Sequence, residues 1–283
     1  MGRLGIIAGA GELPHLAMQE AISENEDPIF LSIKESDFQV GKFNDRNIPI
    51  HITKIGSVIK TCKKNNIDRI LLLGKVNKDI LLKSYKFDLK TIFLLAKMLN
   101  QNDYTFFQIG AQEFLKNKIT ILSQKTYLKS LLLTGGRYTK KKLNKNELID
   151  IEYGMGLARE LARLDLGQTV AVMNRMALSL EAIEGTDEAI RRGGQLSKNK
   201  GATVCKSAKS NQDERFDLPT VGINTLNIMK EFSYKTLAIQ ARETIVVNPV
   251  EFIRKANELS IHFFVYDKNE DIKILNKKQV IYV

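Results

Sequence analysis

The sequence has few of the residues that form disulfides or bind metals, and it has no long apolar segment. Its two cysteines, Cys62 and Cys205, lie far apart and outside any CxxC spacing, which argues against a disulfide and a structural zinc site. The histidines His15, His51 and His262 lie outside metal-ligand spacings such as HxxxH. No apolar run approaches the ~20 residues of a membrane span, and the N-terminus does not resemble a secretory signal. We therefore expect a cytoplasmic protein.

Positive charge, in contrast, is present in excess. Lysine and arginine number 43, aspartate and glutamate 32, and the formal net charge is +11. Such an excess suits nucleic acid, an anionic membrane surface or phosphorylated ligands. Lysine, asparagine and isoleucine are all abundant, so compositional drift is an equal alternative. The basic segments lack interleaved aromatic residues, and we expect no nucleic-acid partner.

Strand-like and helix-like patterns alternate along the chain. In the first half, apolar runs typical of strands lie at 4–8, 29–33, 48–53, 69–73 and 119–122, and helical patterns lie at 13–23, 55–65 and 89–115. In the second half, the predicted strands are 169–173, 176–183, 244–247 and 261–266, and the predicted helices are 147–164, 226–232 and 249–259. The alternation predicts an α/β fold with two domains. A basic, aperiodic segment at 135–146 is the predicted linker between domains 1–134 and 147–283.

A glycine motif lies between the first predicted strand and the first predicted helix. Gly9 and Gly11 resemble the opening of a dinucleotide-binding fingerprint, in which backbone amides approach a phosphate at a helix N-terminus. Pro14 stands where the third glycine is expected, and no acidic ribose partner is clear, so we expect no nicotinamide cofactor. The alternatives that stay open are a nucleotide phosphate or ribose contact and a purely structural tight turn.

The segment from Leu180 to Gly222 crowds acids, bases and amides beside glycines, without the regular stripe of a surface helix. In its first part, Thr186 is a candidate N-cap, and Asp187 would complement the positive end of the helix that follows. That structural role accounts for Thr186 and Asp187. It leaves Glu181 and Glu184 unexplained.

The second part of this segment carries the stronger indication of a reaction. Asp217 precedes Leu218 and Pro219, so its backbone is predicted to be extended or in a turn, with the carboxylate facing a cleft. Carboxylates suit Mg²⁺, and the neighbouring lysine and arginine side chains suit phosphate oxygens. A solvated charged loop is the equal alternative from spacing alone.

Five segments together give the chain a resemblance to the LpxI type of UDP-2,3-diacylglucosamine pyrophosphatase. They are LGIIAGAGELP at 4–14, LGKVNK at 73–78, RLDLGQTVAV at 163–172, LEAIEGTDEAIRR at 180–192 and KSAKSNQDERFDLPTVG at 206–222. They occur in the expected order and span most of the chain. Ser210 departs from the family, which often has proline there; the loss removes a rigid turn residue but no charged group.

The resemblance implies a Rossmann-like N-terminal domain, a distinct C-terminal α/β domain and a lipid substrate between them. It implies hydrolysis of UDP-2,3-diacylglucosamine to UMP and 2,3-diacylglucosamine 1-phosphate (lipid X) in lipid A biosynthesis, with a divalent cation, typically Mg²⁺. It further implies peripheral contact with the cytoplasmic face of the inner membrane, and a homodimer is possible. The family's essential aspartate falls at Asp217.

The expected site combines the segment at 180–222 with the glycine motif. Asp217 is the predicted catalytic residue, and Asp217, Asp213 and Asp187 are the predicted metal ligands. The predicted substrate-binding residues are Gly9, Gly11, Gln168, Thr186, Lys206, Lys209, Gln212 and Arg215. A protein that binds a nucleotide-linked or phosphorylated ligand between two domains without chemistry is the alternative function.

Overall fold

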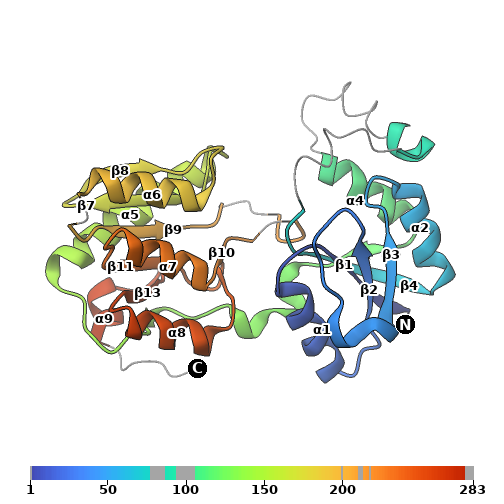
Figure 1. Cartoon of the computed structure of the whole chain (residues 1–283), viewed down its shortest axis with the longest axis horizontal. Coiled ribbons are helices and arrows are strands. Elements are labelled where there is room, and N and C mark those ends of the chain that lie inside the picture. The colour runs from blue at the N-terminus through green and yellow to red at the C-terminus, as the bar shows by residue number, and fades with distance from the viewer. Residues whose placement is uncertain are drawn as a thin grey trace. The chain divides into compact units, whose positions relative to one another are not determined.

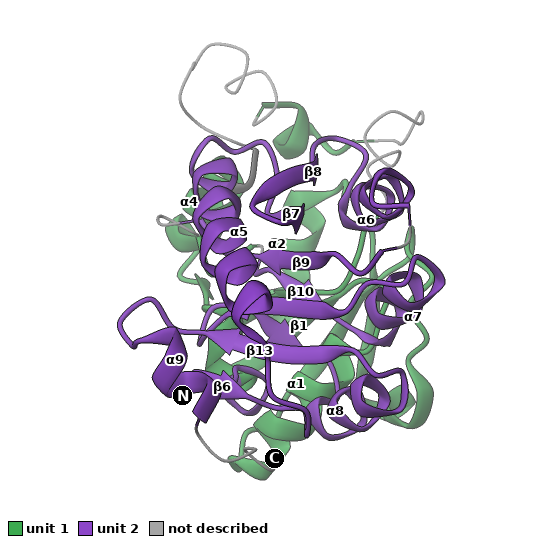
Figure 2. Cartoon of the chain, turned by 90° about the vertical axis from the view of Figure 1, so that its left-hand side faces the viewer, with its two compact units in different colours: residues 1–128, 213–217 green, residues 129–212, 218–283 purple. Residues whose placement is uncertain are grey.

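The computed structural model describes residues 2–76, 87–93, 106–198, 200–209, 213–216 and 218–277 (Figure 1). The chain forms two compact units, coloured separately in Figure 2: unit 1 comprises residues 1–128 and 213–217, and unit 2 comprises residues 129–212 and 218–283. Unit 1 combines helices with a parallel sheet and unit 2 combines helices with a mixed sheet, so the prediction of an α/β fold with two domains is confirmed. None of the described helices is both long and apolar enough to cross a membrane.

Unit 1 is built on a five-stranded parallel sheet with the order β3-β2-β1-β4-β5. Its strands are β1 (Arg3–Ala8), β2 (Ile29–Ile33), β3 (Asn47–Ile50), β4 (Ile67–Leu73) and β5 (Thr120–Ile121). The described helices are α1 (Leu13–Ser23), α2 (Ile55–Lys64) and α4 (Phe106–Lys116), with 3₁₀ turns η1 (Gly41–Arg46) and η3 (Gln124–Tyr127). The strand order reverses between β1 and β4, which is where ligands bind in open parallel sheets.

Unit 2 is built on a six-stranded mixed sheet with the order β6-β13-β11-β9-β7-β8. Its strands are β6 (Gly136–Arg137), β7 (Thr169–Met173), β8 (Met176–Leu180), β9 (Thr203–Lys206), β11 (Thr236–Gln240) and β13 (His262–Tyr266). The central strands β9, β11 and β13 are parallel, whereas β6, β7 and β8 complete the edges in antiparallel pairs. β10 (Thr220–Val221) and β12 (Ile245–Val246) form a separate parallel pair.

Helices cover both faces of the unit 2 sheet, as Figure 2 shows, with α5 and α9 on one side and α6, α7 and α8 on the other. The helices are α5 (Lys145–Arg163), α6 (Thr186–Leu196), α7 (Ile223–Glu231), α8 (Pro249–Glu258) and α9 (Ile272–Lys277), with a 3₁₀ turn η4 (Lys129–Leu131). Alternate residues of β13 enter different cores: Phe264 packs with the α5 and α9 side chains, and Phe263 with those of α6, α7 and α8. This period of two is typical of a strand buried on both faces.

The predicted linker at 135–146 is wrong, because this segment is part of unit 2 and the chain leaves unit 1 after Leu128. β6 pairs with β13, and the buried Arg137 donates hydrogen bonds to the carbonyls of Thr139 and Lys140. Asn144 begins α5 with a capping box that includes Glu147. The polar residues that suggest a linker in the sequence therefore make the backbone bonds that fix the segment.

A second difference concerns residues 213–217, which the sequence assigns to the C-terminal domain and the structure to unit 1. The backbone carbonyl of Glu214 accepts a hydrogen bond from the backbone amide of Gln124 (2.8 Å), and the Glu214 carboxylate accepts one from Ser123 Oγ (2.8 Å). The same carboxylate forms an ion pair with Lys125 Nζ (2.7 Å). Phe216 packs against the apolar core of unit 1. These contacts hold residues 213–216 on unit 1, although both neighbouring stretches of chain belong to unit 2.

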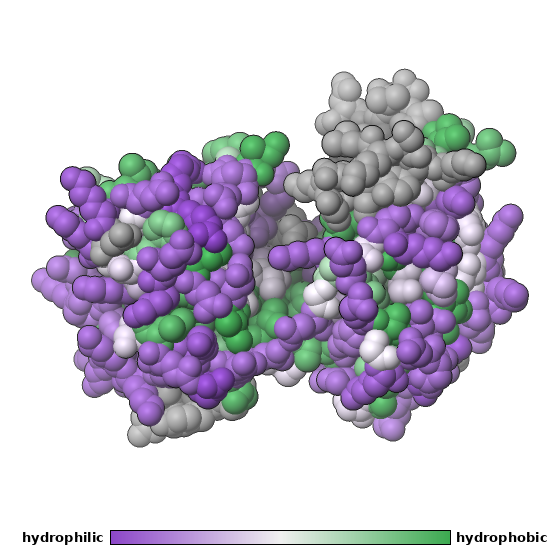
Figure 3. Space-filling view, in the orientation of Figure 1, coloured by the Kyte–Doolittle hydropathy of each residue, from purple (hydrophilic) through white to green (hydrophobic). Residues whose placement is uncertain are grey.

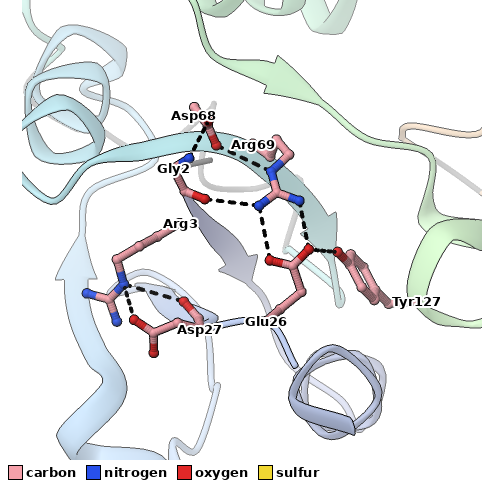
Figure 4. Close-up of polar contacts among 7 residues, drawn as sticks. All are labelled: Gly2, Arg3, Glu26, Asp27, Asp68, Arg69 and Tyr127. Atoms are coloured by element: carbon pink, nitrogen blue, oxygen red, sulfur yellow. Dashed lines mark hydrogen bonds and ion pairs between the residues drawn. The ribbon is translucent and has the colours of Figure 1, made fainter. Parts of the chain in front are cut away.

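An ion network ties four separate parts of unit 1 together (Figure 4). Arg69, on β4, donates to both carboxylate oxygens of Glu26 (2.8 and 3.0 Å), to the carbonyl of Gly2 (3.0 Å) and to Asp68 Oδ1 (3.3 Å). Tyr127 Oη donates to Glu26 Oε1 (3.0 Å). The hydrogen bond from Arg69 lowers the pKa of Glu26 below its ordinary 4.5, against the opposing effect of burial. Burial raises the pKa of Tyr127 to about 12. The network thus favours an ionised Glu26 and a neutral Tyr127.

Glu26→Gln should lower the free energy of unfolding by about 1–3 kcal/mol, because the partly buried Arg69 loses the carboxylate that accepts two of its hydrogen bonds. Urea unfolding of the full chain measures the loss. Since the pKa of Glu26 is lowered in the fold, its contribution is complete above pH 4.5 and disappears as the pH falls through the lowered value. The difference from the unsubstituted protein should therefore shrink in acid.

Asp27→Asn is the matched control, because this carboxylate is 59% exposed and pairs with Arg3 and Arg46. Its loss should cost less than about 1 kcal/mol. Equal losses for Glu26→Gln and Asp27→Asn would contradict a stabilising role of the network.

Candidate active site

The glycine motif of unit 1 lies where β1 and β4 end. The amide of Gly9 donates to the carbonyl of Leu73 (2.8 Å), and Ala10 and Lys75 exchange two backbone hydrogen bonds. A Cβ at position 9 would lie 2.6 Å from the Lys75 carbonyl oxygen, so close backbone approach explains Gly9. Gly11 has φ +108° and open space around it. Gly9 is therefore fixed by packing, and Gly11 is the glycine that a ligand could approach.

A polar cluster occupies one edge of the unit 2 sheet. Parallel strands β9 and β11 end there, and because β7 runs antiparallel to β9, β7 begins and β8 ends at the same edge. Ligands of open α/β sheets bind outside the carboxyl ends of parallel strands. The residues gathered at this edge are Gln168, Thr169, Glu181, Thr186, Lys206, Ser207 and Gln240. Three of them, Gln168, Thr186 and Lys206, are predicted site residues.

Lys206 is the central charge of this cluster. It is the last residue of β9, only 6% exposed, and its Nζ donates to Thr186 Oγ1 (2.9 Å). The Thr186 hydroxyl in turn donates to Glu181 Oε1 (2.9 Å), and Glu181 Oε2 accepts from the backbone amide of Gln168 (3.2 Å). A buried ammonium group requires such partners, since burial removes its water. The chain Lys206–Thr186–Glu181 therefore fixes a positive charge at the edge of the sheet.

Helix α6 begins beside Lys206, and the structure corrects the predicted role of Thr186 there. The N-cap is Gly185, with φ +85°, and Thr186 is the first helical residue, so its hydroxyl is directed to Glu181 rather than to the helix amides. Asp187 and Glu188 lie in the first turn, as predicted. Within the part of the chain that the structure describes, no side-chain hydrogen bond caps this helix start. An uncapped helix N-terminus beside a lysine suits an anion.

Ser207 and Gln240 form a second fixed pair at this edge. Gln240 ends β11, and its Oε1 accepts from Ser207 Oγ (2.6 Å) and from the Ala208 amide (3.1 Å). Both donors act on the same oxygen, so the orientation of the carboxamide is determined and Nε2 points away from them. Among the described residues, Nε2 has no acceptor, and it is not sealed from solvent. Gln240 thus presents a preorganised donor.

The other predicted residues differ in their surroundings. Lys209 forms an ion pair with the exposed Asp165. Arg215 donates to both carboxylate oxygens of Asp213 (2.8 and 2.7 Å), and this hydrogen bonding is the main reason that the pKa of Asp213 is lowered. Lys206 and Lys209 belong to unit 2, whereas Asp213 and Arg215 belong to unit 1. The predicted residues Gln212 and Asp217 lie outside the described residues.

The predicted metal ligands fit a hard divalent cation unequally. Asp187 is exposed, and Oδ2 accepts from Asn224 Nδ2 (2.9 Å), at the start of α7. This carboxylate can take a cation. Both oxygens of Asp213 are bound by Arg215, which competes with a metal for them. No group of three or more potential ligands was found within the part of the chain that the structure describes. Asp187 is therefore the better fit of the two.

The sequence did not single out Thr169, Ser207, Gln240 or Asn224. Gln240 carried a usable signal, because it is a polar residue that ends the β-prone run TLAIQ. Thr169 and Ser207 are 1% and 0% exposed, and their positions depend on which strands become neighbours. Glu181 was noticed without a role, and the hydrogen bond to Thr186 supplies one.

Comparison with known proteins covers almost the whole chain. The family model described as the LpxI N-terminal domain matches residues 3–131, and the model described as the LpxI C-terminal domain matches residues 134–264. A UDP-2,3-diacylglucosamine pyrophosphatase LpxI of Caulobacter vibrioides is 25% identical over 281 residues, which cover 95% of this chain and 99% of that protein. The match includes the segments that carry the polar cluster.

Proposed function

The chain belongs to the LpxI family, and we propose that it hydrolyses UDP-2,3-diacylglucosamine to UMP and 2,3-diacylglucosamine 1-phosphate in lipid A biosynthesis. The observation that carries the proposal is the buried Lys206 beside the uncapped start of α6, because a diphosphate needs a fixed positive environment. The similarity to the Caulobacter enzyme supplies the class of substrate.

In this proposal each residue of the polar cluster has a defined task. The ammonium group of Lys206 and the first-turn amides of α6 stabilise the negative charge that develops on the diphosphate as the bond breaks. Thr186 and Glu181 hold that ammonium group in place. Gln240 Nε2 donates to a phosphate or sugar oxygen and orients the substrate. The cluster therefore binds and positions the diphosphate.

The reaction further requires a water molecule and a second positive charge. We assign the orientation of the attacking water to Asp217, following the family resemblance, with attack at the phosphorus on the sugar side. Asp217 and Asp187 would hold Mg²⁺, which supplies charge neutralisation at the diphosphate. Asp213 would join them only if Arg215 released its carboxylate.

Asp217→Asn should abolish UMP release and affect substrate binding much less, because the side chain orients the water and helps to hold the metal, whereas Lys206 and the start of α6 still bind the diphosphate. Asp37→Asn, which also removes one carboxylate charge from an exposed position, should be neutral. In ¹⁸O-labelled water the label should enter 2,3-diacylglucosamine 1-phosphate. Label in UMP would refute sugar-side attack, and near-normal turnover of Asp217→Asn would refute the role of Asp217.

The same assay separates an enzyme from a two-domain binding protein without chemistry. An enzyme that uses a divalent cation releases UMP, loses the activity in chelator and regains it with Mg²⁺. A binding protein retains the lipid without releasing UMP under either condition.

Lys206→Met should lower kcat/KM by about 10²-fold, as loss of one electrostatic stabiliser of a transition state does. Thr186→Val should have a smaller effect of about tenfold, since it removes only the hydroxyl that orients Lys206. Thr186→Ser should restore most of the activity. Steady-state kinetics measures all three, with the exposed Lys230→Met on α7 as the control. A purely structural Thr186 would lose stability without this graded loss in kcat/KM.

Contact with the cytoplasmic face of the inner membrane is also part of this proposal. Leu166 lies in the loop before β7 (Thr169–Met173) and Ile183 in the loop after β8 (Met176–Leu180). Because the start of β7 pairs with the end of β8, both loops lie near the edge that carries Lys206. They are 57% and 98% exposed. Figure 3 shows hydrophobic residues on the surface of unit 2 over the loops next to β8 and α6. Exposed apolar residues on a protein of net charge +11 suit an anionic lipid surface.

The double substitution Leu166→Ser and Ile183→Ser should weaken binding to phosphatidylglycerol vesicles several-fold in a sedimentation assay. High salt should weaken the binding of the unsubstituted protein. Ile274→Ser on α9, which is 58% exposed, is the control and should leave binding unchanged. Binding that neither salt nor the double substitution alters would contradict this contact.

A further inference from the structure

A cavity lies at the amino edge of the unit 2 sheet, opposite the edge that carries Lys206. Its volume is about 500 Å³, within the range of small-molecule sites. Because His262 is the first residue of β13, the cavity lies at the edge where β11 and β13 begin, away from the strand ends that carry Lys206 and Gln240. Its walls include Lys140, Lys141, Arg254, Asn257 and His262. The proposed hydrolysis uses none of these residues.

His262 is held in the cavity wall by a buried carboxylate. The residue is 7% exposed, and its Nδ1 lies 2.6 Å from Glu147 Oε1. Glu147 also accepts hydrogen bonds from Thr236 Oγ1 (3.0 Å) and from the Asn144 amide (2.8 Å). Burial acts to raise the pKa of Glu147, but the hydrogen bonds from His262 and Asn144 outweigh it, so the pKa is lowered. An ionised Glu147 only accepts hydrogen bonds, so Nδ1 of His262 carries a proton.

The other ring nitrogen of His262 is available to a ligand. Nε2 has no hydrogen-bond partner among the described residues, and it is not sealed from solvent. His262 lines the cavity, so the cavity is where a ligand would meet the ring. A polar ring atom that is oriented by a buried carboxylate and left without a partner is a feature of a binding site.

The segment that carries the two lysines is fixed rather than loose. Arg137 donates to the carbonyls of Thr139 and Lys140, and the Lys140 amide donates to Asn257 Oδ1 (2.9 Å). The amide of Phe263 donates to Thr139 Oγ1 (3.0 Å). These hydrogen bonds fix the backbone that carries the lysine side chains.

The charges of the cavity favour an anion. Lys140 and Lys141 have no acidic partner among the described residues. Arg254 pairs with Glu258 and Glu251 on α8, so these charges largely cancel. The charged and titratable groups around His262 are thus Glu147 from α5, Arg254 and Glu258 from α8, and the two lysines. Protonation of His262 adds one more positive charge.

We propose that this cavity binds a small molecule bearing a phosphate group, whose oxygens accept hydrogen bonds from Nε2 of the protonated His262 ring and from the ammonium groups of Lys140 and Lys141. Glu147 positions the imidazole and compensates its charge when it is protonated. Binding strengthens as the pH falls, because both ring nitrogens of the imidazolium are donors.

Titration of the full chain with inorganic phosphate, followed by calorimetry and by the NMR signals of His262, tests the site. His262→Asn is the informative variant, because its amide nitrogen replaces Nδ1 toward Glu147 while no atom replaces Nε2. It should weaken phosphate binding at least fivefold, and Lys140→Ala with Lys141→Ala should do the same. Lys230→Ala, which removes an exposed charge on α7, should leave binding unchanged.

The pH dependence of anion affinity is measured with sulfate, because sulfate keeps its charge over the range in which the imidazole titrates. Its affinity should fall at least fivefold from about pH 5.5 to about pH 8 in the unsubstituted protein and stay level in His262→Asn. Bound phosphate should shift the NMR signals of the His262 ring, a result that needs no variant to fold. Chloride at equal ionic strength should move neither readout.

Absence of phosphate binding at millimolar concentration, or equal affinities in His262→Asn and Lys230→Ala, would overturn the proposal. These readouts do not depend on turnover. Loss of UMP release in Asp217→Asn therefore tests the proposed reaction, and phosphate affinity in His262→Asn tests this second site, so either can fail alone.

Discussion

The burial of Lys206 constrains the whole carboxyl edge of the unit 2 sheet. An ammonium group at the end of a central strand loses most of its hydration, and its desolvation is tolerated only with hydrogen-bond partners. Its Nζ donates to Thr186 Oγ1, and Thr186 is within reach because α6 begins at Gly185. Glu181 then accepts from Thr186 and from the amide that precedes β7. One buried charge thereby connects the starts of α6 and β7 with the ends of β8 and β9.

The route of the chain divides the segment that carries the predicted chemistry. Lys206 belongs to the unit 2 sheet, whereas Glu214 and Phe216 are bound to the surface and core of unit 1. A single stretch of sequence therefore contributes to both units within about ten residues. Two units that share a segment in this way cannot be cut apart at one point of the chain. The chain passes between the units three times: after Leu128, before residue 213 and after residue 217. A cut after Leu128 removes only the first of these connections.

The sequence predicted the elements whose apolar pattern is long and uninterrupted, and the structure explains the exceptions. β1, β2 and β4 are buried runs bounded by polar residues or glycine, so their positions follow from composition. β6 has two residues and β9 has four, too few for a periodic signal, although β9 places Lys206. Both depend on neighbours distant in sequence, as β6 does on β13. Local patterns do not contain that information.

The site residues follow the same division. Lys206 and Thr186 were predictable as a type, since a phosphate needs cations and hydroxyls, but their mutual contact required the fold. Gly9 was assigned a ligand contact by its motif, whereas its amide donates to the carbonyl of Leu73 and its missing Cβ is explained by the approach of the Lys75 backbone. A glycine motif records a close backbone approach. It does not record whether a ligand or another strand makes that approach.

The two edges of the unit 2 sheet use buried charge differently. At the carboxyl edge, the Thr186 hydroxyl connects Glu181 to Lys206. At the amino edge, Glu147 contacts His262 directly, and the positive charge exists only after protonation. Glu147 also caps α5 with its second oxygen. Its carboxylate is thus held by the helix it caps, and the fixed carboxylate fixes the imidazole tautomer. The sequence around His262 gives no sign of this, because the ring is oriented by Glu147, a helix-capping residue 115 positions away.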